Sequence, residues 1–325
     1  MCLLGPLRGG LKVLEVRDLK MVFPVKQGLL RRAAGQVKAV DGVSFSIGRG
    51  ETLGLVGESG CGKTTVGKCV VRLLRPSGGS VLFEGRDIAA LDRKALKEYR
   101  RKMQIVFQDP FGSLNPRMTV SDIVGEGPAI LGDPSREQRV VELLETVGLS
   151  PEDGSRYPHE FSGGQRQRIG IARAMAVGPS FIVCDEPVSA LDVSIQAQIL
   201  NLLEELQERF SLSYLIVAHD LSVVRHIADK VVVMYVGQVM EEAPTEELFA
   251  RPLHPYSRVL FSSIPSLDPS RRGGLNPLPG EPPSPVDPPP GCRFASRCPQ
   301  CMAQCREGEI ALIEVSPNHR VRCLL

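Results

Sequence analysis

A glycine-rich turn between an apolar run and a helical segment constrains this chain more than any other feature. It follows residues 53–56, and its members are Gly57, Glu58, Ser59, Gly60, Cys61, Gly62, Lys63, Thr64 and Thr65. Strand, turn and helix together form the context in which the pattern G-x-x-x-x-G-K-[ST] binds phosphate. The glycines let successive backbone N–H groups point inward, and the following helix adds its positive end. In such a site Lys63 reaches the β- and γ-phosphates and the Thr64 hydroxyl ligates Mg²⁺.

Polar side chains follow three further apolar runs that read as strands. Asp185 and Glu186 end the run 181–186, Gln108 follows 103–107, and His219 follows 214–218. Ligands collect at the carboxyl ends of strands in open α/β sheets. There Asp185 and Gln108 suit Mg²⁺, Glu186 suits a general base that aligns the attacking water, and His219 can contact a γ-phosphate. The sequence therefore predicts an α/β P-loop NTPase with an intact hydrolytic site.

A second glycine-rich helix start predicts a dimer. It consists of Ser162, Gly163, Gly164 and Gln165, with Ser162 as the expected N-cap. A helix over 162–177 is about 24 Å long at 1.5 Å per residue. Because the next strand returns Asp185 to the phosphates, the Ser162 end must lie far from Lys63 of its own chain. This anion-binding helix start, with Asp192 near it, should therefore serve the nucleotide of another chain in a head-to-tail dimer.

Composition restricts the remaining classes. The 325 residues carry a formal net charge of +2, which gives no reason to expect a nucleic-acid partner. No apolar run approaches the roughly 20 residues of a membrane helix, and the start lacks a signal-peptide core. We therefore expect a cytoplasmic chain. Residues 26–36 look like a loop between strands, and 109–178 look like an inserted helical subdomain.

The C-terminal region has two unusual parts. Residues 261–291 are rich in proline and should form an extended strap. Beyond them lie Cys292, Cys298, Cys301, Cys305 and Cys323, within only 34 residues. Such a short segment cannot build a stable core unaided, so we expect a bound metal or a covalent cross-link to stabilise it. Disulfides are the less favoured cross-link because they are unusual in the cytoplasm. Four thiolates suit either Zn²⁺ or an iron–sulfur cluster, although only Cys298 and Cys301 form the C-x₂-C pair that zinc ribbons favour.

One cysteine falls inside the glycine-rich turn. Cys61 lies close to the N-terminus of the expected helix. That field lowers the pKa of a thiol and favours its reactivity. We therefore expect alkylation of Cys61 to inactivate the protein and Mg-ATP to protect it.

Taken together, these motifs resemble ABC-transporter nucleotide-binding subunits in both order and spacing, from about residue 11 to 260. The strings at 107–116 and 252–256, with the cysteine-rich tail, resemble the ATPases of oligopeptide and dipeptide importers. The resemblance implies a RecA-like core, an antiparallel β subdomain and a helical subdomain. It makes Phe23 the adenine-stacking residue, Gln108 the sensor that faces the membrane partner, Glu186 the catalytic base and His219 the γ-phosphate switch. It also implies a [4Fe–4S] cluster on Cys292, Cys298, Cys305 and Cys323, with Cys301 to spare.

The same resemblance implies a function and a set of partners. The chain would hydrolyse ATP to drive peptide uptake from the cytoplasmic face of the membrane. Its partners would be a second, different ATPase subunit, two membrane permease subunits and an extracytoplasmic peptide-binding protein. An importer of nickel or another metal chelate is one alternative. A soluble ABC ATPase outside transport is another, but those usually carry two cassettes or a long coiled coil, and neither occurs here.

Overall fold

The computed structural model describes residues 11–27, 32–189, 191–262 and 280–325. The expectations for residues 1–10 and for the strap over 263–279 fall outside these ranges. The described chain divides into two compact units. Unit 1 holds residues 11–15, 46–52 and 81–215, and unit 2 holds 16–45, 53–80 and 216–325, within the described ranges. Each unit is described separately below.

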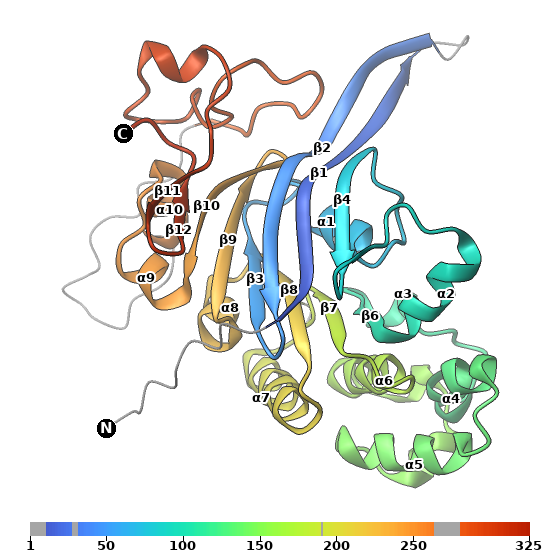
Figure 1. Ribbon diagram of the computed structural model, residues 1–325. Coiled ribbons are helices and arrows are strands. Elements are labelled where there is room, and N and C mark those ends of the chain that lie inside the picture. The colour runs from blue at the N-terminus through green and yellow to red at the C-terminus, as the bar shows by residue number, and fades with distance from the viewer. Residues whose placement is uncertain (1–10, 28–31, 190, 263–279) are drawn as a thin grey trace. The chain divides into compact units, whose positions relative to one another are not determined.

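Unit 2 is built around strands of the parallel core and a C-terminal antiparallel edge. Its strands follow the order β11-β12-β10-β9-β3, with β3 parallel to β9 and β9 antiparallel to β10 (Figure 1). Most of the long strands β1 and β2 also belong to it. The elements are β1 Lys12–Gln27, β2 Arg32–Gly48, β3 Thr52–Val56, α1 Lys63–Val70, α8 Leu221–Ile227, β9 Lys230–Tyr235, β10 Gln238–Pro244, α9 Thr245–Ala250, α10 Pro255–Ser262, η4 Ala303–Arg306, β11 Ile313–Ser316 and β12 His319–Val321. The chain passes from unit 1 to unit 2 within β8, Ser213–Ala218.

Unit 1 combines two parallel strands with a group of helices. Strand β6 pairs in parallel with β7, and every residue of β7 is buried, as expected for its apolar run 181–184, which ends in Asp185. The predicted helical stretch 109–178 contains α3 to α6 (Figure 1). The elements are β4 Gly78–Phe83, β5 Arg86–Asp87, α2 Arg93–Lys102, β6 Met103–Val106, α3 Pro110–Ser113, α4 Val120–Leu131, α5 Arg136–Thr146, η1 Pro151–Ser155, η2 Pro158–Glu160, α6 Gly163–Met175, β7 Phe181–Asp185 and α7 Val193–Phe210.

The predicted loop over 26–36 was wrong. Strand β1 continues to Gln27 and β2 already begins at Arg32, so most of this polar stretch is strand. Polar composition misled the prediction because backbone pairing holds a strand without apolar side chains. Strand β2 also has a partner from the proline-rich region: a bridge joins Val37 to Val286, and Lys38 N donates to Pro285 O at 3.0 Å. The described end of the strap is therefore tied to β2.

No helix within the described ranges is both long and apolar enough to cross a membrane.

Candidate active site

The glycine-rich turn of unit 2 adopts a backbone that only glycine fits at two positions. Gly57, Gly60 and Gly62 have φ values of 149°, 78° and 104°. A Cβ at Gly57 would lie 2.1 Å from the Met234 carbonyl oxygen, and one at Gly62 would lie 2.1 Å from that of Ala39. Neither backbone carbonyl can move away cheaply. The sequence pattern is therefore a geometric requirement, and Gly62 becomes the N-cap of α1.

Lys63 lies at the centre of this turn. Its Nζ donates to the carbonyl oxygens of Gly57 at 2.8 Å and Glu58 at 3.0 Å, and the side chain is buried. Thr64 follows it in the first turn of α1. The loop thus bends around an ammonium group at the positive end of a helix, which is the arrangement expected of a phosphate site.

The expected activation of Cys61 is contradicted. The thiol is only 4% exposed, and burial raises its pKa. Lys63, whose Nζ lies 3.7 Å from the Cys61 Sγ, acts in the opposite direction but with less effect. Desolvation of the thiolate therefore outweighs the favourable field, and the sequence could not reveal that burial.

Of two other predicted residues of unit 2, one lies on a strand and one directly follows a strand. His219 directly follows β8 and is exposed, and the next residue, Asp220, caps α8 by accepting from Ser222 N at 2.8 Å. Phe23 lies on β1 with 37% of its surface exposed. Both side chains are thus accessible to a ligand.

In unit 1 the parallel register of β6 and β7 brings two predicted residues together. Val106 pairs with Cys184, so the residues two positions further along each strand are also neighbours. There the Gln108 Nε2 donates to the Glu186 Oε2 at 2.8 Å. Asp185 is buried at the end of β7, and Glu186 turns away from the strand with φ +48°. A positive φ at a residue that is not glycine costs about 1–2 kcal/mol, which the surrounding loop must offset.

Side chains beyond Glu186 hold that loop. The Ser189 Oγ donates to the Glu186 carbonyl oxygen at 3.2 Å, and the Gln196 Nε2 donates to the Leu191 carbonyl oxygen at 3.0 Å. Asp192 then forms the N-cap of α7, and its side chain is exposed. The backbone from Glu186 to α7 is therefore held by side-chain hydrogen bonds near both of its ends.

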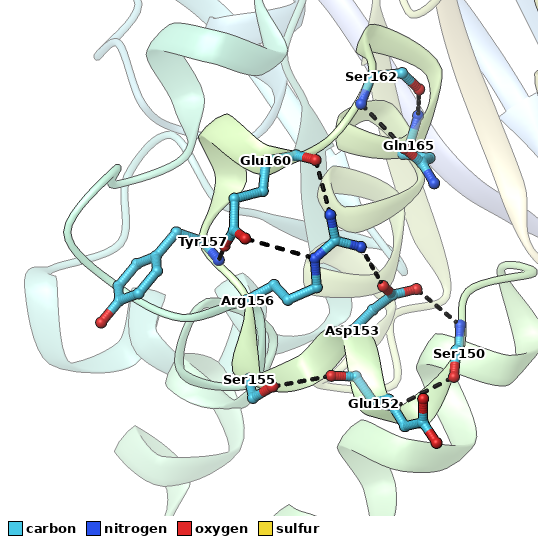
Figure 2. Close-up of polar contacts among 9 residues, drawn as sticks. All are labelled: Ser150, Glu152, Asp153, Ser155, Arg156, Tyr157, Glu160, Ser162 and Gln165. Carbon is cyan, nitrogen blue, oxygen red and sulfur yellow. Dashed lines mark hydrogen bonds and ion pairs between the residues drawn. The ribbon is translucent and has the colours of Figure 1, made fainter.

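The second glycine-rich helix start has the predicted cap. The Ser162 Oγ accepts from Gln165 N at 3.3 Å, and Ser162 N donates to the Gln165 Oε1 at 3.0 Å (Figure 2). Gly164 packs so tightly that a Cβ there would lie 2.6 Å from the Ile195 Cγ2, and Gly163 has Leu191 beside it. The helix start of α6 is thus built against the start of α7.

Sequence reasoning missed Arg156, which supports this helix start. Figure 2 shows its guanidinium group between Asp153, at 2.8 Å, and Glu160. The guanidinium carbon also lies 4.4 Å from the centre of the Phe161 ring, directly before Ser162. Acids three residues before and four after the arginine were the available signal.

The tail of unit 2 brings four cysteines around one pocket. They are Cys292, Cys298, Cys305 and Cys323, the four implied by the resemblance. Cys301 is not among the lining residues, and its Sγ contacts the Met302 carbonyl oxygen at 3.5 Å. A backbone hydrogen bond joins two of the lining residues, since Cys292 N donates to Cys305 O at 2.7 Å.

The pKa of Cys292 is raised both by burial and by the other thiols of the pocket. Burial raises the pKa of Cys292 to about 11, and the charges of Cys298, Cys305 and Cys323 add to the effect. Among the residues described here, no group of three or more His, Cys, Asp or Glu side chains is arranged to hold a metal ion. The four thiols that line the pocket are the ligand type and number that an iron–sulfur cluster takes, as the resemblance implies.

Comparison with known proteins settles the family. Residues 40–189 match the family described as ABC transporter, and residues 240–305 match the family described as oligopeptide/dipeptide transporter, C-terminal region. The chain is 53% identical over 321 residues to the oligopeptide transport ATP-binding protein AppF of Bacillus subtilis (strain 168), covering 96% of this chain and 97% of that one. This chain belongs to the ABC transporter family. The predicted family, fold class and ATPase activity of this ABC ATPase are thereby confirmed.

Other relatives and solved structures agree. A putative peptide import ATP-binding protein of Brucella ovis is 50% identical over 315 residues, covering 96% of this chain and 97% of that one. Among solved structures, cbiO1 from Clostridium perfringens, described as part of the ABC transporter complex cbiONQ, matches with a TM-score of 0.64 and 29% identity, over 74% of this chain and 91% of that one. The cassette MJ0796, described as a dimer in a post-hydrolysis state bound to ADP and Pi, matches with a TM-score of 0.62 and 28% identity, over 71% of this chain and 98% of that one.

Proposed function

We propose that this ABC ATPase powers the uptake of oligopeptides or dipeptides through an importer. The observation that carries the proposal is that one chain combines the ABC region with the oligopeptide/dipeptide transporter C-terminal region. Relatives at 50–53% identity that span nearly the whole chain carry oligopeptide or peptide import names. A nickel importer or an ATPase outside transport remains the alternative to be tested.

The phosphate loop is the proposed binding site of ATP. Its members are Gly57, Glu58, Ser59, Gly60, Cys61, Gly62, Lys63, Thr64 and Thr65. Thr64, Gln108 and Asp185 would hold Mg²⁺, which supplies charge neutralisation to the phosphates when bound. Phe23 would stack on the adenine ring.

Hydrolysis is assigned to Glu186. The carboxylate aligns a water and accepts its proton, and the hydrogen bond from Gln108 orients the carboxylate for this task. His219 contacts the γ-phosphate and responds to its loss. The helix start made by Ser162, Gly163, Gly164 and Gln165, with Asp192, binds the nucleotide of the opposite subunit.

The proposed assembly contains more than this chain. A second, different ATPase subunit completes the head-to-tail dimer, and two permease subunits form the path through the membrane. An extracytoplasmic binding protein delivers the peptide. The ATPase pair lies on the cytoplasmic face as a peripheral component.

Uptake in cells tests this function. A strain that lacks the chain should fail to accumulate a labelled tripeptide and should regain uptake with the parental chain. The Lys63→Ala variant should not restore it, because the ammonium group at the centre of the loop is lost. Loss of nickel uptake with normal peptide uptake would replace peptide by metal chelate as the cargo.

The thiol pocket is proposed to hold a [4Fe–4S] cluster through Cys292, Cys298, Cys305 and Cys323. Bound to these four thiolates, the cluster would cross-link the turns of the tail. Protein purified without oxygen should be brown and contain about four iron atoms per chain. Iron should be lost when Cys292 and Cys305 are both changed to serine and should remain in Cys301→Ser, the matched control. Colourless protein with stoichiometric zinc would overturn this assignment.

A further inference from the structure

The phosphate loop of unit 2 is contacted directly by the cysteine-rich tail. The Arg297 Nη1 donates to the Glu58 carboxylate oxygens at 2.9 Å and 3.1 Å, and to the Tyr235 hydroxyl at 3.1 Å. Glu58 is the second residue of the loop, and Arg297 directly precedes Cys298. The arginine side chain is only 7% exposed and the Glu58 side chain 24%, so this ion pair is partly shielded from water.

The backbone of the same loop residue has a second anchor. Glu58 N donates to the Tyr256 hydroxyl oxygen at 2.9 Å. Burial raises the pKa of Tyr256, so its hydroxyl stays neutral. The Tyr256 ring lies 4.6 Å from that of Tyr235 and 5.4 Å from that of Phe294, measured between ring centres. Tyr256, which binds the backbone of Glu58, and Tyr235, which Arg297 contacts, therefore belong to one buried aromatic cluster.

This cluster is continuous with the thiol pocket. Phe294 is fully buried and lines the pocket together with Cys292 and Cys298. Ala295 N donates to Cys292 O at 3.0 Å, and Arg297 N donates to Phe294 O at 2.9 Å. The turn that begins at the first thiol of the pocket thus sets the position of Arg297.

The charge of Glu58 gives this contact a consequence for binding. A carboxylate on a loop that receives a polyphosphate repels the ligand, and the repulsion is large where water is excluded. Arg297 cancels that charge and, with Tyr256, holds the residue at the start of the loop.

We infer that Arg297 is a positioning residue for ATP: it neutralises Glu58 and fixes the phosphate loop, and so makes nucleotide affinity depend on the cysteine-rich tail. The inference rests on the proposed role of the loop in binding ATP. It assigns Arg297 no contact with the nucleotide.

A double-mutant cycle on the full chain tests this inference. Arg297→Gln removes the charge but keeps most of the side-chain volume. The Kd for a nonhydrolysable ATP analogue with Mg²⁺, measured by calorimetry, should rise about 10- to 100-fold, the range expected for losing a buried charge-assisted hydrogen bond. In a Glu58→Gln background the same arginine change should raise Kd less than about threefold, because no carboxylate is left to compensate. In turnover assays with the partner subunits, KM should rise while kcat changes little.

The tail offers a matched control. Arg293 is 6% exposed, nearly the same fraction as Arg297. It pairs with Asp41, which lies outside the loop. Arg293→Gln should lower the melting temperature about as much as Arg297→Gln, yet leave the analogue Kd within about twofold. Equal Kd values for the parental chain and Arg297→Gln would overturn the inference, as would an undiminished arginine effect in the Glu58→Gln background. If the parental chain binds no analogue, the proposed function fails instead.

Discussion

Replacing Glu186 by glutamine separates nucleotide binding from hydrolysis. The change exchanges one carboxylate oxygen for an amide group and keeps the side-chain volume. The remaining amide oxygen can still accept the hydrogen bond that the Gln108 Nε2 donates at 2.8 Å. The backbone at φ +48° is also unaffected, because both side chains branch beyond Cβ. The variant therefore loses the negative charge and the basicity of the carboxylate and little else.

The size of the effect distinguishes this role from a structural one. Removing a general base costs about 10²- to 10⁴-fold in turnover, which corresponds to about 2.7–5.4 kcal/mol. Losing only the Gln108 hydrogen bond costs about 0.5–1.5 kcal/mol, or at most about tenfold. Glu186→Gln should thus lose at least about tenfold more turnover than the loss of that hydrogen bond alone would cost.

Steady-state turnover with the partner subunits and analogue binding by calorimetry measure the two quantities. We expect an unchanged Kd, a strongly reduced kcat and a dimer that stays closed on ATP. If Glu186→Gln turns over ATP within about tenfold of the parental chain, the assignment of Glu186 as the base is refuted.

Alanine substitutions at two glycines of α6 should change the free energy of unfolding in opposite directions. A Cβ at Gly164 would lie 2.6 Å from the Ile195 Cγ2, so Gly164→Ala should destabilise the fold by about 1–3 kcal/mol, whereas Gly170→Ala meets nothing within 4 Å and should stabilise it by about 0.5–1 kcal/mol. Thermal unfolding of both variants checks the pair, and equal shifts would contradict the packing. Because burial raises its pKa, Cys61 should react with iodoacetamide near neutral pH more slowly than the partly exposed Cys301 in iron-loaded protein, as peptide mass analysis would show. Faster labelling of Cys61 would restore the expectation of an activated thiol.

Much of the fold could be predicted because local signals agreed with one another. Strands β6 and β7 begin at Met103 and Phe181, where the apolar runs 103–107 and 181–186 begin. The cap at Ser162 followed from its residue type and the Gln three positions later. The strands around 26–36 could not be predicted, because their hydrogen bonds come from pairing and leave no apolar pattern.

The site could be predicted as two sets of residues but not in its physical detail. Motif spacing identified Gln108 and Glu186, and the parallel register of their strands explains why they touch. The positive φ of Glu186 and the burial of Cys61 have no signature in the sequence, since both depend on neighbours contributed by distant segments.

The cysteine-rich tail shows why a premise drawn from length alone misleads. From its length and its few apolar residues, the 34-residue tail is expected to need a metal or a covalent cross-link for its stability. Instead, β12 adds to the core sheet, with Glu241 opposite Val321. The buried His319 places its two ring nitrogens 2.8 Å from Glu241 and from Glu247. The sheet therefore holds the last part of the tail.

A metal or a cross-link is then needed only where the sheet does not stabilise the tail, in the turns between residues 291 and 305. These turns contain Cys292, Cys298 and Cys305, and they present Arg297 to a loop residue 239 positions earlier in the chain. No pattern in the sequence distinguishes this arginine from the others, because its partner is defined by the folded chain. If the thiol site served stability alone, nothing would require its turn to contact the phosphate loop. Since the contact joins an arginine to a carboxylate on an anion-binding loop, removal of the proposed cluster should weaken nucleotide binding before it unfolds the core.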